Sequence, residues 1–410
     1  MKITPVKGTA DYLPSEVLVR DYLQSTILET YRSCGFERIT TPIIEDIENL
    51  DKSEGGENLN LIFKIMKRGE KLDEAIASGD PKELSDMGLR YDLTLPLTRY
   101  YANNRAKLPS PFKVIQIDKV YRAERPQKGR MREFMQCDID IIGSDSYTAE
   151  VELIGTTAKA LHNIGFENFY IRVNDRRLLK AIIMSAGFLE ADCDSVCISL
   201  DKLDKIEAAG VSEELKAKGF DEAKVDKLMA SIGKQPFTLD DAASICGDID
   251  CLANLKKIID LSASASGGKY GVVYDMTLVR GQGYYTGTVF EISSPDFRGA
   301  IGGGGRYDNL IGKFLGESIP AVGFSIGFER IAGILLDKNY KIPGRKPRMA
   351  LVYTEETFPA ALTHADELRC EYDVALFEAP KKLGKLFARL EESGYAGCVI
   401  EGKDEVKMFE

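Results

Sequence analysis

The sequence predicts an α+β protein whose main sheet is interrupted by a helical insertion and followed by a small α/β domain. Three observations support this prediction. Residues 112–143 and 271–292 alternate apolar and polar side chains with the period of two that β-strands show. Between them, residues 181–267 combine leucine and isoleucine with many lysines and glutamates, as amphipathic helices do. From residue 349 onward, short apolar strands alternate with helical patterns, which is typical of a small parallel sheet.

The composition is that of a globular protein with several domains. The chain has 410 residues, of which 44% are hydrophobic and 29% are charged. No apolar run approaches the roughly 20 residues of a membrane span, and residues 1–14 lack the apolar core of a signal peptide. We therefore expect a cytoplasmic protein that does not bind a membrane. The net charge of −10 argues against indiscriminate coating of nucleic acid, but a local basic patch for one structured RNA stays open.

The cysteines and histidines predict no metal site. The chain has eight cysteines and two histidines. The closest cysteine pairs have x3 and x4 spacings instead of the usual x2 spacing, and both histidines lie far from them. These pairs are Cys193 with Cys197, and Cys246 with Cys251. We expect free buried thiols, and with so few histidines we do not expect catalysis by an imidazole.

The first predicted element is a helix over residues 15–33. Its apolar residues recur every four positions, at Val19, Leu23, Ile27 and Tyr31. Ser15 is a suitable N-cap and Gly35 supplies the stop. A short strand over residues 36–41 then runs into Pro42.

Two further strands are predicted over residues 59–67 and 88–93, with a polar helical excursion between them. In the segment LRYDLTLPLTRYYANN, Asp92 and Thr94 alternate with apolar residues. A sheet edge with surface polar residues accounts for this pattern.

Residues 112–143 predict a β-hairpin with a long basic connection. In its second half the apolar positions are Met135, Cys137, Ile139 and Ile141, whereas the opposite face carries Phe134, Gln136, Asp138 and Asp140. Arg122 and Glu124 share a face upstream, and residues 125–131 form the connection. Such charged walls suit a polar, anionic ligand, although a solvated charged hairpin has the same pattern.

The remaining elements follow in order. A helix is predicted over residues 148–164, a strand over 169–173, and a flexible joint at 262–268 after the insertion. The strand pattern of 271–292 is broken by glycines at 281 and 283, and four consecutive glycines follow at 302–305. Glycines there permit a close backbone approach to a bound molecule. The segment 337–348 has two prolines and a glycine, which is typical of a domain boundary.

Several of these segments together resemble a known family. The sequence YRAERPQKGRMREFMQCDIDIIG closely resembles the second signature motif of class II aminoacyl-tRNA synthetases, in the form found in histidyl-tRNA synthetases. LVRGxxYYTGTVFE, GGGGRYD and GFSIGFER follow in the order and spacing of that family, and the last also resembles the third class II motif. The helix, strand and proline at 15–42 have the layout of the first motif, although an ordinary helix–strand unit shares that layout.

The resemblance implies a fold and a division into domains. It implies a class II synthetase catalytic core with an antiparallel sheet, made of residues 1–180 and 268–336. Residues 181–267 would be a mostly helical insertion, and residues 349–410 a short α/β domain like the family's anticodon-binding domain. The sequence ends at Glu410, where the domain of the family normally continues. A possible RNA-facing stripe consists of Lys381, Lys382, Lys385 and Arg389 along one predicted helix, for which a solvated helix face is the alternative.

The resemblance also implies a function in protein biosynthesis. The expected activity is ATP-dependent activation of L-histidine to histidyl-adenylate and its transfer to tRNA(His), by a homodimer that uses ATP and Mg²⁺. Activation brings two anions together, so positioning and cationic stabilisation carry most of the catalysis. Arginine suits this task because its charge is permanent and its fork matches phosphate geometry.

By resemblance, three groups of residues have roles. The catalytic arginines would be Arg122 and Arg280, on either side of the α-phosphate, and Arg330, at the γ-phosphate. The ATP-binding residues would be Arg122, Glu124, Arg130, Phe134 and Arg330, with Glu124 at the adenine amino group and Phe134 stacked on the ring. The histidine-binding residues would be Asp92, Thr94, Arg122, Gln136, Asp140, Arg280, Tyr284, Tyr285 and Tyr307.

The chain departs from the family pattern at three places. Gly281, Gln282 and Gly283 replace the usual Gly-Leu-Asp, Met135 stands where a histidine is frequent, and the C-terminal domain is short. One alternative is a non-catalytic paralogue on the same scaffold, acting as a regulatory subunit of ATP phosphoribosyltransferase in histidine biosynthesis. Another alternative is an enzyme that forms an aminoacyl-adenylate without RNA.

Overall fold

The computed structural model of the protein describes residues 3–50, 61–126, 130–233, 236–247, 249–279, 284–403 and 406–409. The chain divides into two compact units, Met1–Tyr340 and Lys341–Glu410. The first unit contains the large sheet, the insertion and the cavity discussed below. In the described part of the chain, no helix is long and apolar enough to cross a bilayer.

The first unit is built on a mixed sheet. In the described part of the chain, this sheet has eight strands. In spatial order they are β1 (Glu37–Arg38), β5 (Phe112–Tyr121), β6 (Glu133–Ile142), β11 (Ala321–Ile326), β10 (Phe297–Arg306), β9 (Thr288–Ser294), β7 (Tyr170–Asp175) and β8 (Gly271–Tyr274). The pairs from β5 to β7 are antiparallel, whereas β1 and β8 pair in parallel at the two edges. The predicted antiparallel core and α+β fold are confirmed.

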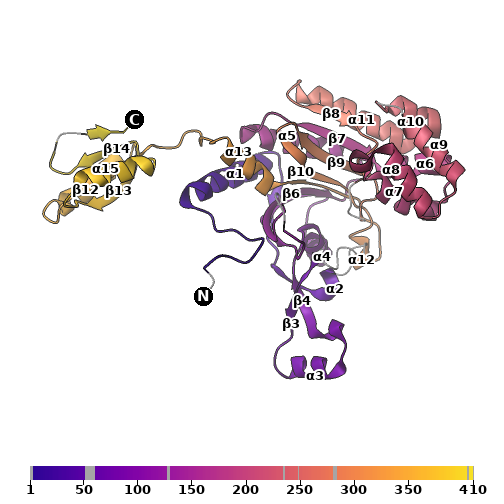
Figure 1. Ribbon diagram of the computed structural model, residues 1–410, viewed down its shortest axis with the longest axis horizontal. Helices are drawn as coiled ribbons and strands as arrows, with labels where there is room; N and C mark the ends of the chain where they lie inside the picture. Colours follow the sequence, from indigo (N-terminus) through magenta and orange to yellow (C-terminus); the bar gives the residue numbers. More distant parts are fainter. Residues whose placement is uncertain are drawn as a thin grey trace. The chain divides into compact units, whose positions relative to one another are not determined.

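Three helices pack together on one face of this sheet: α1 (Pro14–Ser33), α5 (Thr148–Asn163) and α13 (Phe328–Asp337) (Figure 1). The four-residue spacing of α1 places Val19, Leu23, Ile27 and Tyr31 in the core, where each is at most 7% exposed. On β6, the apolar residues Cys137, Ile139 and Ile141 are buried, as predicted. Because successive strand residues point to opposite faces, the polar residues of β6 face away from these helices.

A smaller sheet lies at one end of the first unit. Its spatial order is β2 (Ile44–Asp46), β4 (Ser85–Leu89) and β3 (Phe63–Met66). Short helix α2 (Ile47–Leu50) follows β2, and β3 and β4 form an arm with α3 (Glu70–Ser78) near its tip (Figure 1).

The prediction of a strand over residues 88–93 is wrong beyond Leu89. There the chain leaves β4 and enters helix α4 (Thr94–Asn104). The physical reason is local, because Asp92 Oδ1 accepts a hydrogen bond of 3.1 Å from the Leu95 N–H and so satisfies one donor of the first helical turn. Asp92 and Thr94 therefore do not alternate along a strand.

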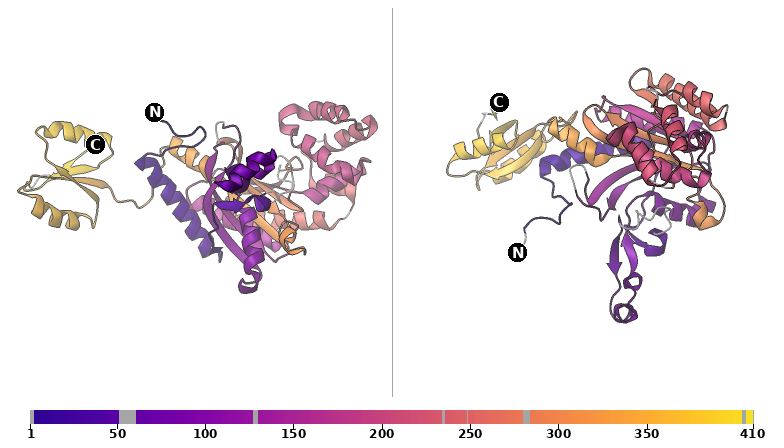
Figure 2. Two further views of the ribbon diagram at one scale, coloured as in Figure 1. Left: turned by 90° about the horizontal axis from the view of Figure 1, so that it is seen from below. Right: turned by 45° about the vertical axis from the view of Figure 1, so that its right-hand side comes forward.

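Between β7 and β8 the chain forms helices at that edge of the main sheet, and these helices include the residues 181–267 that the sequence predicted to be mostly helical (Figures 1 and 2). In order they are α6 (Arg176–Ser185), α7 (Cys193–Leu200), α8 (Leu203–Ala217), α9 (Glu222–Ile232), α10 (Leu239–Cys246) and α11 (Asp250–Ser266). Asp175 caps α6 by accepting a hydrogen bond from the Arg177 N–H. After α11 the chain returns to the sheet at β8, and short helix α12 (Gly312–Leu315) follows β10.

The second unit is a sheet covered on both faces. Its spatial order is β13 (Asp373–Glu378), β12 (Arg348–Tyr353), β14 (Gly397–Ile400) and β15 (Val406–Met408). The first three strands are parallel and β15 is antiparallel. Along β12, Met349 and Leu351 pack under α14 (Phe358–Leu368), whereas Ala350 and Val352 pack under α15 (Leu383–Glu392). Since α15 begins at Leu383, Lys381 and Lys382 precede the helix that the sequence predicted to carry them.

Candidate active site

A cavity of about 420 Å³ lies on the face of the main sheet opposite α1 and α5. Its walls come from β6, β10, β11 and the starts of α4 and α13. Twelve of the residues predicted from the sequence line it: Asp92, Thr94, Arg122, Glu124, Arg130, Phe134, Gln136, Asp140, Tyr284, Tyr285, Tyr307 and Arg330. The thirteenth, Arg280, lies outside the residues that the structure describes.

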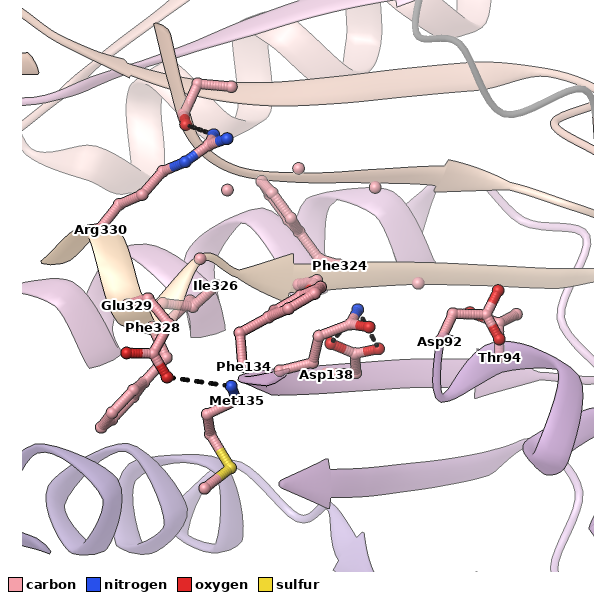
Figure 3. Close-up of a pocket in the computed structure, with 18 of the residues that line it drawn as sticks. Asp92, Thr94, Phe134, Met135, Asp138, Phe324, Ile326, Phe328, Glu329 and Arg330 are labelled. Atoms are coloured by element: carbon pink, nitrogen blue, oxygen red, sulfur yellow. Dashed lines mark hydrogen bonds between the residues drawn. The ribbon is translucent and has the colours of Figure 1, made fainter. Parts of the chain in front are cut away.

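The two ends of the cavity differ in charge. Figure 3 shows Asp92 and Thr94 at one end and Arg330 at the other, with Phe134 and Asp138 between them. The first end also contains Asp140 and the tyrosines, while Arg122 lies close enough to Asp92 to lower its pKa. The cavity therefore joins an acidic end to a basic one.

Three carboxyl groups are buried at the acidic end. Asp92, Asp138 and Asp140 are 2%, 5% and 4% exposed. Burial raises the pKa of Asp92 to about 6, although the Leu95 backbone hydrogen bond and Arg122 oppose this change. Burial also raises the pKa of Asp140 to about 7 against the effect of its bond from Tyr307. For Asp138, burial and then the neighbouring Asp140 raise the pKa well above its ordinary range. A ligand that brings N–H donors or positive charge would favour the ionised forms.

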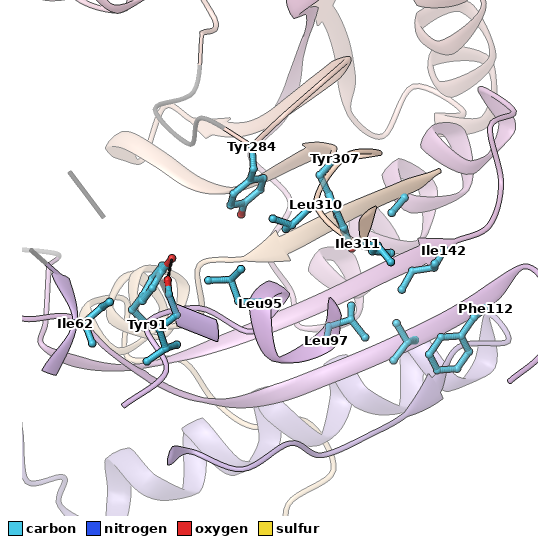
Figure 4. Close-up of a cluster of buried hydrophobic side chains, with 13 residues drawn as sticks. Ile62, Tyr91, Leu95, Leu97, Phe112, Ile142, Tyr284, Tyr307, Leu310 and Ile311 are labelled. Carbon is cyan, nitrogen blue, oxygen red and sulfur yellow. Dashed lines mark hydrogen bonds between the residues drawn. The ribbon is translucent and has the colours of Figure 1, made fainter. Parts of the chain in front are cut away.

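Tyrosines support this acidic end. The Tyr307 hydroxyl donates a hydrogen bond of 2.6 Å to Asp140 Oδ1. The rings of Tyr284 and Tyr307 belong to a buried apolar cluster that also contains Tyr91 and Leu95 (Figure 4). The apolar cluster therefore fixes the rings, while one hydroxyl reaches a carboxylate of the cavity.

Two buried acceptors at this end lack a protein donor. Among the described residues, Asp92 Oδ2 and Gln136 Oε1 make no hydrogen bond. The Gln136 amide instead donates to Asp138 at 3.3 Å, which turns its carbonyl oxygen elsewhere. Buried acceptors without a partner are costly, so a ligand with an ammonium or N–H group is the natural partner for both.

The basic end is organised by arginines and one aromatic ring. The Arg122 guanidinium lies 5.0 Å from the centre of the Phe134 ring, and its Nε donates to the Tyr91 carbonyl at 3.0 Å. Arg330 donates to the Ala300 carbonyl. Arg130 pairs with Glu124 at 3.2 Å. Arginines held in this way can present further N–H groups to phosphate or carboxylate oxygens.

Glycines allow the strands to approach closely beneath the cavity. On β11, a Cβ at Gly323 would overlap Asp140 Oδ1. On β10, a Cβ at Gly304 would overlap the Gly323 carbonyl oxygen. Glycines 302–305 line the cavity without side chains and let β10 lie close to β11. Their close approach to a bound molecule stays a prediction.

Two prominent cavity residues were not among the predicted site residues. Asp138 shares the polar face of β6 with Gln136 and Asp140, so the alternation of the strand could have identified it. Glu329 also lines the cavity, but its main partner is Arg20, 309 residues earlier in the chain. No local sequence pattern reveals that pair.

The described residues show no group of three or more His, Cys, Asp or Glu side chains arranged for a metal ion. Cys193, Cys197, Cys246 and Cys251 are free thiols. Burial raises the pKa of Cys197 to about 12 and that of Cys251 to about 11. Such thiols are poor nucleophiles at neutral pH.

Known proteins resemble the chain over nearly its whole length. Residues 8–331 match the family model of histidyl-tRNA synthetase. A histidine–tRNA ligase of Leifsonia xyli subsp. xyli is 44% identical over 81% of this chain and 80% of its own. A crystal structure of histidyl-tRNA synthetase from Nostoc sp. PCC 7120 has a TM-score of 0.81 and 28% identity, covering 99% of this chain and 93% of that one.

A third similar protein concerns the regulatory alternative. It is a crystal structure from Bacillus halodurans that is described as an ATP phosphoribosyltransferase regulatory subunit/histidyl-tRNA synthetase. It covers 98% of each chain with a TM-score of 0.79, but at 21% identity it shows a shared fold alone. The family model, by contrast, covers most of the first unit, and with the 44% identical relative it shows that this chain belongs to the histidyl-tRNA synthetase family.

Proposed function

We propose that this chain is a histidine–tRNA ligase, which activates L-histidine with ATP and transfers the histidyl group to tRNA(His). The observation that carries the proposal is one cavity with buried carboxyls at one end, Arg330 at the other and Arg122 between them. An amino acid has an ammonium group and, in histidine, a ring with N–H donors, whereas ATP is anionic. The two ends of the cavity match these two substrates.

The acidic end would bind histidine. Asp92, Thr94 and Gln136 would hold the ammonium group, since Asp92 Oδ2 and Gln136 Oε1 are buried acceptors that lack a donor among the described residues. Asp140 and the tyrosine hydroxyls would contact the two ring nitrogens, which offer a donor and an acceptor. Buried groups left unpaired by a wrong amino acid can give discrimination of about 10⁴-fold or more. The proposed residues here are Asp92, Thr94, Arg122, Gln136, Asp140, Arg280, Tyr284, Tyr285 and Tyr307.

The basic end would bind ATP. Phe134 would stack on the adenine with Glu124 at its amino group, Arg130 would contact the nucleotide, and Arg330 would hold the γ-phosphate. The geometry that supports this is the Arg122 guanidinium over the Phe134 ring, at the junction of the two ends. Arg122 would touch both the α-phosphate and the histidine carboxylate. The role of Arg280 on the other side of the α-phosphate rests on the sequence resemblance.

In the first step, a histidine carboxylate oxygen attacks the α-phosphorus of ATP. A carboxylate–phosphorus bond forms, the bond to the bridging oxygen breaks, and pyrophosphate leaves. Arg122, with Arg280, would stabilise the charge that develops on the α-phosphate oxygens. In the second step a ribose hydroxyl at the end of the tRNA attacks the carbonyl carbon, and AMP leaves.

Mg²⁺ would enter with the nucleotide. This ion keeps several waters and is usually held by one or two carboxylates together with substrate phosphates. Glu329, which lines the cavity directly before Arg330, is already engaged by Arg20. We therefore propose that the phosphates of ATP and water would supply most of the ligands of Mg²⁺, with few from the protein.

We assign a proposed role to each domain of the chain. Residues 1–180 and 268–336 would form the catalytic core, 181–267 the insertion, and 349–410 a short anticodon-binding-like domain. In the second unit, Lys381, Lys382, Lys385 and Arg389 are all exposed and supply positive charge for RNA. The activity would take place in the cytoplasm, where tRNA is charged.

The enzyme would work as a homodimer. The smaller sheet of the first unit supports this, because one of its faces carries apolar side chains that this chain leaves partly open. The strand register places Ile44, Phe63 and Leu89 side by side, with Ile65, Met87 and the exposed Asp46 in the next row. Ile44 is 51% and Met87 39% exposed. The first strand of this sheet, β2, follows in the chain after the helix–strand–proline segment 15–42, which in class II synthetases forms the dimer interface.

The regulatory alternative is not favoured. A relative that is 44% identical over 81% of the chain is named histidine–tRNA ligase, whereas the structure that bears the regulatory description is 21% identical. The chain also keeps Arg122 and Arg330 in its cavity, where both would suit the phosphates of ATP.

The decisive experiment is histidine-dependent exchange of labelled pyrophosphate into ATP, followed by charging of tRNA(His). We expect both activities. Absence of exchange would favour the regulatory protein, and exchange without charging would leave an enzyme that forms only the adenylate. Phenylalanine, which is similar in shape but lacks ring nitrogens, serves as the control amino acid and should not support exchange.

A further inference from the structure

Glu329 accepts hydrogen bonds from three directions. Arg20 of α1 donates to both of its oxygens at 2.7 Å, the Met135 N–H donates to Oε1 at 3.1 Å, and the Tyr12 hydroxyl donates to Oε2 at 3.3 Å. The side chains of Arg20 and Glu329 are 14% and 15% exposed. A bidentate, partly buried pair of this kind fixes both groups in one orientation.

Aromatic rings enclose the arginine. The Arg20 guanidinium carbon lies 3.9 Å from the centre of the Tyr12 ring and 5.0 Å from that of Phe328. Burial, together with the charge of Glu329, raises the pKa of Tyr12 to about 12, so its hydroxyl remains a donor at neutral pH. We call Tyr12, Arg20 and Glu329 the N-terminal clamp.

The segment before α1 makes two more contacts with residues that directly precede β6. The Arg132 N–H donates to the Gly8 carbonyl at 2.7 Å, and the Tyr12 hydroxyl lies 3.9 Å from Met131 Sδ. Met131 itself lines the cavity. The N-terminal segment therefore holds the start of β6 at several points.

The clamp holds two residues of the basic end at once. Glu329 directly precedes Arg330 in the first turn of α13, and its bond to the Met135 N–H fixes the strand residue next to Phe134. Figure 3 shows the hydrogen bond from the Met135 N–H to the Glu329 carboxylate. Among the described residues, the clamp makes no hydrogen bond to Asp92, Asp140 or Tyr307 at the acidic end.

We propose that Arg20 and Glu329 are positioning residues that set the nucleotide end of the cavity independently of the amino-acid end. The proposal rests on the proposed function, because it takes Phe134 and Arg330 as ATP contacts. Arg20 acts through Glu329 and touches neither substrate. An α1 side chain outside the cavity thus controls affinity for ATP but not for histidine.

The test compares substrate dependence in pyrophosphate exchange. Arg20→Ala should raise the KM for ATP about 10-fold, since small displacements of positioning groups have large effects, and should change the KM for histidine less than about 2-fold. Arg20→Lys should recover only part of the loss because a point charge cannot replace a bidentate fork. Glu329→Gln should resemble Arg20→Ala, and the double variant should be no worse than either single one.

A matched control is available elsewhere in the same unit. Arg172 pairs with Glu291 at 2.9 Å and with Asp275 at 2.6 Å, and the Arg172 and Glu291 side chains are each 16% exposed. These residues do not line the cavity. Arg172→Ala should lower the melting temperature as much as Arg20→Ala does, without changing the ratio of the two KM values.

Two outcomes would overturn the proposal that Arg20 and Glu329 position the nucleotide end. One is an equal rise of both KM values in Arg20→Ala, and the other is a change in melting temperature alone, as in the control. Titration calorimetry with ATP keeps this proposal separate from the function. If the unmodified chain binds ATP but shows no exchange, the proposed function fails. If Arg20→Ala binds ATP as tightly as the unmodified chain, the clamp fails.

Discussion

The Asp140 side chain is buried, accepts a hydrogen bond from the Tyr307 hydroxyl and lies close to the backbone of Gly323. Its position on the polar face of β6 followed from strand alternation, because the neighbouring odd residues had to enter the core. Its raised pKa did not follow from the sequence. That property depends on β11 and on Tyr307, which lie more than 150 residues away in the chain.

We predict that Asp140→Ala weakens the binding of histidine more than the binding of ATP. Loss of a buried acceptor for the imidazole should raise the dissociation constant for histidine by about 10- to 100-fold. ATP affinity should stay within about 3-fold, because Arg122 and Phe134 keep their contact. Titration calorimetry with each ligand measures both effects. An equal loss for the two ligands would mean that Asp140 supports the fold instead.

The pKa of Asp140 also predicts how stability depends on pH. Burial raises this pKa from 3.8 to about 7, so the folded state holds the proton more tightly than the unfolded chain. The corresponding stabilisation is complete below pH 3.8 and disappears as the pH rises through 7. Asp140→Asn should therefore raise the free energy of unfolding by about 1–3 kcal/mol at pH 8 and change it little near pH 4.

Urea unfolding at the two pH values tests this prediction. The exposed residue Asp21 provides the control, since Asp21→Asn should have little effect at either pH. A lower stability of Asp140→Asn at pH 8 would contradict the assignment of an ionisation penalty to this carboxyl.

Among the elements, those with strong local periodicity were predicted well. The four-residue spacing of α1 and the alternation of β6 each bury one apolar side, whatever the rest of the chain does. Residues 90–93, which lead into α4, were predicted incorrectly as part of a strand, because Asp92 bonds the first turn of α4 only once the chain turns after Leu89. The pairing of Arg20 with Glu329 could not be predicted from the sequence, since it depends on the packing of α1 against α13.

The close approach of β6, β10 and β11 gives a prediction for this group of strands. Gly323→Ala would place a methyl group against Asp140 Oδ1, within strands that are paired on both sides. We expect histidine-dependent exchange to fall by at least about 10-fold, because Asp140 must move. Gly333→Ala on α13 is the control, since its Cβ meets nothing within 4 Å and alanine favours helices. Equal activities of the two variants would contradict the conclusion that Gly323 leaves room for Asp140 in the cavity.

At the scale of the whole molecule, the open apolar face of the smaller sheet predicts assembly. Ile44→Asp should shift a homodimer towards monomers in sedimentation at micromolar concentration, because it places a charge in an apolar contact. Ile198 on α7 is 60% exposed and lies in the insertion, so Ile198→Asp should leave the dimer intact. An active monomer formed by the unmodified chain would contradict the prediction.

The lining of the cavity begins at Leu61 and ends at Arg330, so no short piece of the chain contains the site. During synthesis, the nascent chain must therefore extend at least to Arg330 before the whole cavity can form. After completion, bound substrates should protect the first unit from proteases while the unit of residues 341–410 is cut as before.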